Sequence, residues 1–173
     1  LKLEKLLTKI RKRICHRITK NIETIHSSEL EFIIALGEQC FLNEYVYSMT
    51  EEENRFVNII IQKCKVGEVN EVYIAILSCY YPLYKLINLI GSLKSFNSTD
   101  QNFKQLIRFQ LTEPLTEIEL SKNIKSLGLI NNDISQKVKS QYEDNPYPRW
   151  RYGNHSIKKK VSISQSINNE IQP

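Results

Sequence analysis

The sequence contains only five glycines in 173 residues, and no two of them lie close together. They stand at positions 37, 67, 91, 128 and 153, so at least 24 positions separate each glycine from the next. A loop that cradles a phosphate or a nucleotide-like cofactor uses two or three glycines within a few positions, because only glycine lets the backbone approach the ligand that closely. The spacing therefore predicts that no such cofactor binds within this chain.

Proline is equally scarce, and long apolar runs are missing. Five prolines beside five glycines are too few for a turn-rich β-sandwich or barrel, and they favour helices. The apolar fraction of 41% and the charged fraction of 25% are typical of a globular domain. No uncharged apolar run approaches the roughly 18 residues of a membrane span, and no secretory signal pattern opens the sequence. We therefore expect a soluble, cytoplasmic, all-α domain without membrane contact.

Residue types that perform chemistry are sparse and scattered. Cys15, Cys40, Cys64 and Cys79 include no close pair that would set zinc geometry, and each lies in an apolar helical pattern. We expect four buried, reduced thiols, because free cysteine behaves as a small apolar residue. The three histidines belong to no HExxH motif or Cys–His pair, and no GxSxG motif occurs. The sequence predicts no catalytic residue, no metal site and no cofactor-binding residue.

Positive charge is concentrated at the two ends of the chain. The net charge is +5 overall, but residues 1–20 carry +7, residues 149–173 carry +4 and residues 21–148 carry −6. A basic amphipathic segment can bind nucleic acid or an anionic membrane, or it can dock on an acidic surface of its own protein. The missing aromatic residues among the first 20 argue against nucleic acid, since base stacking lacks a platform there. Docking on the acidic middle of the chain is the preferred interpretation.

Apolar residues recur at three- and four-residue steps through most of the sequence, which is the spacing of helices with one buried face. The first helix is predicted over residues 2–22. Capping boxes at Ser28–Glu31 and Thr50–Glu53 predict the starts of the second and third helices. The third helix is expected to end at about Lys65, before Gly67. Further helices are predicted at 71–80 after the Asn70 cap and at 83–90 before Gly91, with a polar loop at 92–99. The last three are predicted at 101–113 between the Asp100 cap and Pro114, at 117–127 from the Thr116–Glu119 capping box to Gly128, and at 133–143 after the Asn132 cap.

About eight helices with short connections therefore form one compact helical domain, predicted over residues 1–152. Residues 153–173 are polar and rich in serine and asparagine, so they are predicted to be a linker or tail.

One candidate site lies in the second predicted helix. Gln39 and Asn43 are four residues apart and share a face, and Glu44 and Tyr45 lie beside them. Asparagine is a poor residue for the middle of a helix. Because buried polar groups need hydrogen bonds, these side chains are interpreted first as structural cross-links and second as a ligand-facing site.

A second candidate site follows the last predicted helix, where Asn145, Tyr147, Arg149 and Trp150 alternate with two prolines. Each proline pushes the residue before it out of the helical region, so the helix must end and the chain leaves it extended. Tyr147 and Trp150 carry large apolar surfaces on this stiff segment. The segment is predicted to latch across the helices. It is interpreted as a helix stop with two aromatic anchors, as a hinge that positions a neighbouring domain, or as an aromatic and arginine lip for a substrate.

Two motifs in order carry a resemblance to a known family. Gln39-Cys-Phe-Leu-Asn-Glu-Tyr-Val46, followed by Thr50–Glu53, and Gln141-Tyr-Glu-Asp-Asn-Pro-Tyr-Pro-Arg-Trp150 together resemble bacterial tetratricopeptide-repeat proteins that end in a class I S-adenosylmethionine-dependent methyltransferase domain. Tyr80-Tyr-Pro-Leu83 and Glu113-Pro-Leu115 are similar to the segment that joins repeats to enzyme in that family. The resemblance covers roughly residues 3–152.

The resemblance implies that this chain is the helical part between the repeats and the catalytic domain. The repeats would then precede Leu1, and the glycine-rich S-adenosylmethionine loop would follow Pro173. The implied partners are the repeat and methyltransferase domains of the same protein, with a protein substrate as a further possibility. The run Lys158–Lys160 is foreign to the family pattern. The alternative is a free-standing basic helical module that binds a partner protein or nucleic acid.

Overall fold

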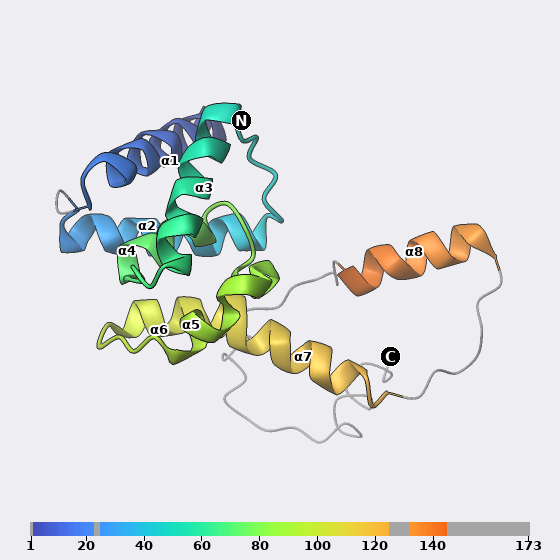
Figure 1. Cartoon of the computed structure of the whole chain (residues 1–173). Helices are drawn as coiled ribbons and strands as arrows, with labels where there is room; N and C mark the ends of the chain where they lie inside the picture. The colour runs from blue at the N-terminus through green and yellow to red at the C-terminus, as the bar shows by residue number, and fades with distance from the viewer. Residues whose placement is uncertain (1, 23–24, 125–131, 145–173) are drawn as a thin grey trace, which may run out of the picture. The chain divides into compact units, whose positions relative to one another are not determined.

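A computed structural model describes residues 2–22, 25–124 and 132–144, and all regular secondary structure in these three ranges is helical (Figure 1). The predicted all-α class is confirmed. The chain divides into two compact units, residues 1–125 and residues 126–173. The first unit contains the helices α1 to α7, and the second contains α8.

The first two helices differ in how they begin. Helix α1 spans Lys2–Lys20 and buries Ile14, Cys15 and Ile18, as its periodicity predicts. Helix α2 spans Ser27–Leu42, and its N-cap is His26, whose side chain makes no capping hydrogen bond. The predicted capping box at Ser28 is therefore wrong. The helix begins one residue before Ser28, so the Ser28 side chain lies inside the first turn.

Two of the predicted caps are present as expected. Helix α3 spans Glu51–Lys65 and opens on the full capping box of Thr50 and Glu53. Gly67 follows α3 with a φ of 96°, in the region that favours glycine, so it ends this helix as predicted. Helix α4 spans Glu71–Ser78, and the Asn70 side chain accepts a hydrogen bond from the Tyr73 amide. Its six buried residues from Tyr73 to Ser78 put α4 in the centre of the unit.

The segment after Pro82 departs from the prediction. Two short 3₁₀ turns, Leu83–Lys85 and Ile87–Leu89, replace the expected single helix. Helix α5, Ile90–Ser95, then includes Gly91, which was predicted to end a helix. The start of the predicted polar loop is therefore helical. Leu93 explains the extension, because it is buried from within α5.

Pro114 does not stop the chain's helical course. Helix α6, Gln101–Ile107, begins on the predicted Asp100 cap and passes into a π-helical segment, η4, Arg108–Thr112. Helix α7, Glu113–Ser121, follows η4 directly, so Pro114 lies within a continuous helical course just after the π-helical segment. The predicted cap at Thr116 is wrong, because this hydroxyl donates to the Thr112 carbonyl inside the helix. Gly128 lies outside the described residues.

The core of the first unit forms where α4 packs against α2, α3 and α1, with α6 on α2 (Figure 1). All four cysteines belong to this core as buried free thiols, which confirms the prediction. No helix among the described residues is long and apolar enough to cross a membrane.

The second unit contributes one described helix. Helix α8 spans Asp133–Asp144, and the Asn132 side chain accepts hydrogen bonds from the amides of Ile134 and Ser135. The predicted Asn132 cap is confirmed. The apolar side chains of α8, Ile134, Val138 and Tyr142, are exposed and recur every four residues on one face.

Candidate functional site

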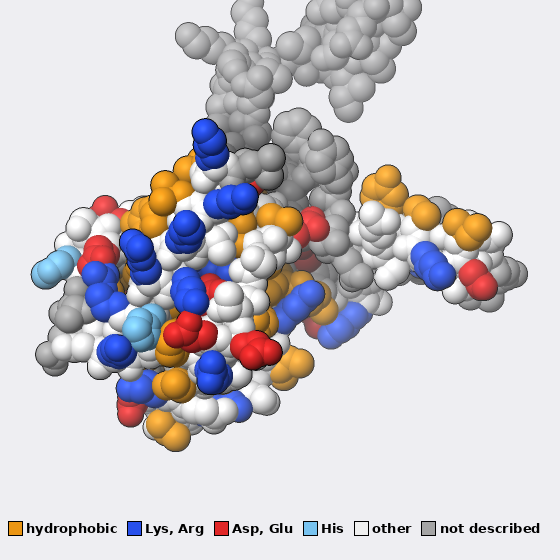
Figure 2. Space-filling model, turned by 90° about the horizontal axis from the view of Figure 1, so that it is seen from above, with side chains coloured by type: hydrophobic (Ala, Val, Ile, Leu, Met, Phe, Trp, Pro, Cys, Tyr) orange, Lys and Arg blue, Asp and Glu red, His pale blue; other side chains and the backbone are white. Residues whose placement is uncertain are grey.

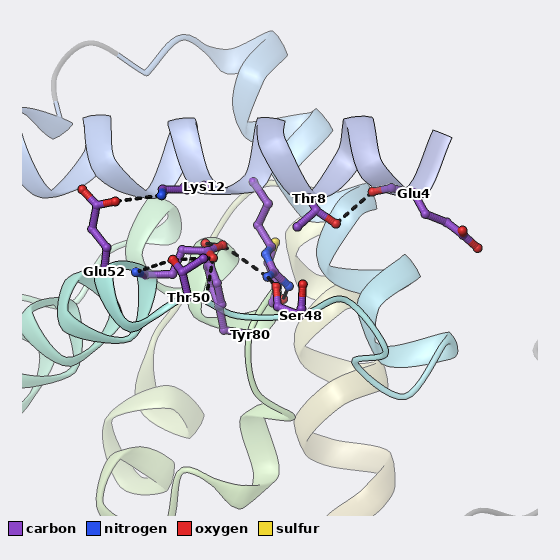
Figure 3. A network of polar contacts seen from close by, with 10 residues as sticks. Glu4, Thr8, Lys12, Ser48, Thr50, Glu52 and Tyr80 are labelled. Carbon is purple, nitrogen blue, oxygen red and sulfur yellow. Dashed lines mark hydrogen bonds and ion pairs between the residues drawn. The ribbon is translucent and has the colours of Figure 1, made fainter. Parts of the chain in front are cut away.

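A polar cluster around two buried charges joins α1, the α2–α3 connection, the start of α3 and the residues after α4 (Figure 3). We call it the Arg11–Glu53 cluster, and its members are Arg11, Ser48, Thr50, Glu53 and Tyr80. Arg11 Nη2 lies 3.2 Å from Glu53 Oε1, and each of the two side chains is 1% exposed. Such a pair is stable only when further hydrogen bonds offset the loss of water around both charges.

The backbone places both charges where they meet. Arg11 stands on the apolar face of α1, four residues after Leu7 and three before Ile14, so it points into the core. Glu53 is the third residue of α3, and its capping box turns the carboxylate back toward the Thr50 amide. The helix start is a favourable place for a negative charge, because unpaired amides and the helix dipole are positive there.

Both charged groups have additional partners. Arg11 Nη2 donates to the Ser48 carbonyl at 2.7 Å, and the guanidinium carbon lies 4.3 Å from the centre of the Tyr80 ring. Glu53 Oε1 also accepts from the Tyr80 hydroxyl at 3.0 Å. Glu53 Oε2 accepts from the Thr50 amide at 2.8 Å and from the Thr50 hydroxyl at 3.0 Å. Four donors therefore surround one carboxylate, which is about as many as its lone pairs can accept.

This environment keeps Glu53 ionised. Burial raises the pKa of the Glu53 carboxyl, but the hydrogen bonds from Thr50 and Tyr80 and the charge of Arg11 outweigh burial and hold that pKa below its ordinary value. A general base needs an oxygen within reach of a substrate proton. Both oxygens of Glu53 are instead occupied by groups of the same domain, so the geometry supports a structural cross-link and not catalysis.

A second buried network brings α2, α4 and the π-helical segment together. Gln110, in the segment η4, is fully buried. Its Nε2 donates to the Gly37 carbonyl at 2.8 Å and to the Ser78 carbonyl at 3.3 Å. The Tyr45 hydroxyl lies 3.0 Å from Gln110 Oε1 and 3.1 Å from the Ser78 carbonyl oxygen. This Tyr45–Gln110 network therefore ties three segments to one another through hydrogen bonds.

Tyr45 reaches this network from an unusual backbone. Glu44 and Tyr45 both have a φ of 58°, in the left-handed region that non-glycine residues rarely adopt. The Tyr45 amide donates to the Cys40 carbonyl at 2.8 Å, which closes the end of α2. The tertiary hydrogen bonds of the Tyr45 hydroxyl help to offset the roughly 1–2 kcal/mol that a left-handed residue costs.

The first predicted site is thus only partly assembled. Tyr45 joins a structural network, as the first interpretation expected, whereas Gln39 and Glu44 are exposed. Asn43 is not in the middle of a helix, because α2 ends at Leu42 and Asn43 is its C-cap. The buried Asn43 Oδ1 accepts no hydrogen bond within the described part of the chain. The second predicted site, with Asn145, Tyr147, Arg149 and Trp150, lies outside the described residues.

Sequence reasoning missed Arg11 and Gln110, and it did not predict that Tyr45 and Glu53 would meet them. Arg11 carried a usable signal, because it interrupts the apolar face of α1 at a position where Ile or Leu would fit the period. Glu53 was recognised as a capping residue, but its buried partner was not. Gln110 had no local signal, since its burial depends on a π-helical turn that the apolar period does not predict.

Three of the four buried thiols have a raised pKa, whereas the hydrogen bond from Cys79 lowers the pKa of the Cys40 thiol. Burial raises the pKa of Cys15 to about 12 and that of Cys64 to about 11, and it raises the pKa of Cys79 well above its ordinary value. Within residues 2–22, 25–124 and 132–144, no group of three or more His, Cys, Asp or Glu side chains could hold a metal ion.

Searches against protein-family models, curated proteins and solved structures each returned no match to this chain.

Proposed function

We propose that this chain is a non-catalytic helical accessory domain that holds a neighbouring catalytic domain in position. The observation that carries the proposal is the use of its buried polar groups. Arg11, Glu53, Tyr80, Tyr45 and Gln110 all direct their hydrogen bonds to other parts of the same domain. Such cross-links fix helices against one another, and among the described residues both buried charged side chains, Arg11 and Glu53, take part in them.

The neighbouring domain, on this proposal, is an S-adenosylmethionine-dependent methyltransferase. Support comes from the resemblance of the Gln39–Val46 and Gln141–Trp150 motifs, in this order, to the helical segment that precedes such domains. The glycine spacing agrees, because it predicts that S-adenosylmethionine binds outside these 173 residues. The helical domain would orient the catalytic domain and help to capture its methyl-accepting substrate.

A binding experiment tests this proposal. The natural protein, produced with the sequence that follows Pro173, should bind S-adenosylmethionine in isothermal titration calorimetry, whereas residues 1–173 should not. No binding by the longer protein would contradict the assignment to a methyltransferase. Stoichiometric binding by residues 1–173 alone would contradict the placement of the cofactor site outside this chain.

A further inference from the structure

The outward face of α1 carries a line of cations. Arg11, Ile14 and Ile18 anchor the opposite face in the core, so the rotation of the helix about its axis is fixed. At about 100° per residue, five basic side chains fall within an arc of about 80° on the outward side. All five are exposed, and we call them the basic stripe: Lys2, Lys5, Lys9, Arg13 and Lys20.

The charge of the basic stripe is not neutralised by its neighbours. None of the five forms an ion pair with an acidic side chain among the described residues. Two acidic residues on neighbouring helices are already paired with other cations of α1: Glu52 pairs with Lys12 at 2.7 Å, and Glu29 pairs with Arg17. Figure 2 looks onto this side of the unit and shows Lys and Arg side chains gathered over α1. Docking of α1 on the acidic part of its own chain therefore accounts for its flanks and not for the basic stripe.

The shape of the basic stripe matches a linear polyanion. Eighteen residue steps at about 1.5 Å separate Lys2 from Lys20, which gives a straight row about 27 Å long and, for an arc of about 80°, about 7–8 Å wide. Duplex DNA carries a negative charge about every 1.7 Å along its axis when both strands are counted, so about 16 phosphates lie within about 27 Å. These phosphates wind around the duplex, and a straight row of cations faces only the fraction of them on one side. The row can contact that fraction without bending the helix.

A lipid surface fits these observations less well. A helix that lies in a membrane interface buries its apolar face in the lipid. The apolar face of α1 is packed in the core instead, with Ile18 only 1% exposed. The exposed apolar residues of α1, Leu3 and Leu6, are confined to its first two turns, so most of the basic stripe has no apolar residue to insert.

We propose that the basic stripe binds the phosphate backbone of duplex nucleic acid without reading its sequence. Helix α1 contains no Phe, Tyr or Trp that could stack on a base, and the ring of His16 is stacked against Phe56. Contacts would be limited to phosphates, which give affinity and little specificity. This inference is independent of the proposed accessory role, because it concerns residues 1–173 alone.

The test is the salt dependence of binding to a fluorescein-labelled 20-base-pair DNA duplex, followed by anisotropy with residues 1–173. Five phosphate contacts predict that log K falls with log salt with a slope of about −4.5. The triple variant Lys5→Gln/Lys9→Gln/Arg13→Gln removes three contacts, so its slope should be about −1.8. A matched triple, Lys94→Gln/Lys104→Gln/Lys137→Gln, removes the same charge from exposed positions elsewhere and should keep the slope of the original chain.

Three results would overturn the inference. Equal weakening by both triple variants would mean that net charge, and not the basic stripe, attracts the duplex. Binding to vesicles of three parts phosphatidylcholine and one part phosphatidylserine, without binding to the duplex, would assign the stripe to a membrane. No measurable binding to the duplex at 50 mM salt would remove the interaction altogether. Circular dichroism of each variant verifies that the helices are intact.

Discussion

Replacing Glu53 with glutamine should destabilise the first unit far more than its small change in shape suggests. The carboxylate accepts at both oxygens, from Arg11 and Tyr80 at Oε1 and from the Thr50 amide and hydroxyl at Oε2. A glutamine amide offers only one oxygen. In either orientation its NH₂ group faces one N–H donor that cannot accept, the Arg11 guanidinium or the Thr50 amide, and the buried guanidinium of Arg11 loses its counter-charge.

The size of the effect follows from this burial. Removing one partner of a buried ion pair costs about 3–5 kcal/mol, because the remaining charge is left uncompensated in the core. For a unit of this size, such a loss lowers the melting temperature on the order of 10–20 °C. Urea unfolding followed by circular dichroism measures the free energy, and the matched control is Glu52→Gln. Glu52 pairs with Lys12 at the surface, where solvent screens the charges, so its replacement should change stability little.

A double variant separates charge from packing. Arg11→Leu/Glu53→Leu removes both charges together, so it should be less destabilising than the sum of Arg11→Leu and Glu53→Leu measured singly. Equal unfolding free energies for Glu53→Gln and Glu52→Gln would refute the reasoning, because the cluster would then contribute no more than a surface pair.

Four further measurements address the rest of the fold. The pKa of Glu53 is lower in the folded chain than in the unfolded chain, so the ionised carboxylate stabilises the fold above about pH 4.5. This stabilisation is lost as the pH falls through the folded-state pKa. Urea titrations between pH 7 and pH 3 should show the loss in the original chain and less of it in Glu53→Gln. Gly37→Ala should lower the free energy of unfolding in urea by about 1–3 kcal/mol, because the added Cβ would lie 2.0 Å from Ser78 Oγ. The control is Gly91→Ala in α5, where the added Cβ meets no atom within 4 Å. That variant should raise the free energy of unfolding by roughly 0.4–1 kcal/mol. Gln110→Leu should cost on the order of 1–3 kcal/mol, because it leaves the buried carbonyls and the Tyr45 hydroxyl with fewer partners, and an unchanged urea midpoint would contradict the network. At pH 8 the four cysteines should react with a thiol reagent only after unfolding, because all are buried and burial raises the pKa of three of them; rapid labelling of the native chain would show that a thiol is accessible.

Local signals predicted the fold class and several helix boundaries. Thr50 with Glu53, Asn70, Asp100 and Asn132 all cap helices as expected, since each cap depends on residues within three positions. The errors came where tertiary packing outweighs local preference. Leu93 is buried from within α5, and the helix includes Gly91. The π-helical turn places Gln110 in the core, and the helical course continues past Pro114.

The two buried networks were not predictable in the same way, because they join residues far apart in sequence. Arg11 meets Glu53 across 42 positions, and Gln110 meets Gly37 across 73. A single sequence shows that Arg11 interrupts an apolar face, but it does not show which acidic residue pairs with it. Nothing in one sequence pairs an arginine with one of the three acids at residues 51–53, and the capping geometry of α3 makes that choice.

Helix α1 illustrates how one segment can serve both packing and binding. Its eight basic residues divide according to their position around the helix: Arg11 is buried with Glu53, Lys12 and Arg17 pair with acids on α3 and α2, and the other five face outward. Neutralising the three that touch the domain removes the repulsion that would otherwise keep so basic a helix from packing. The five that remain are held by this anchoring in one straight row, so a ligand that binds them need not order the helix first. Loosening the anchor should therefore weaken binding at the basic stripe, and Glu53→Gln measured against the DNA duplex below its unfolding temperature should show a lower affinity than Glu52→Gln.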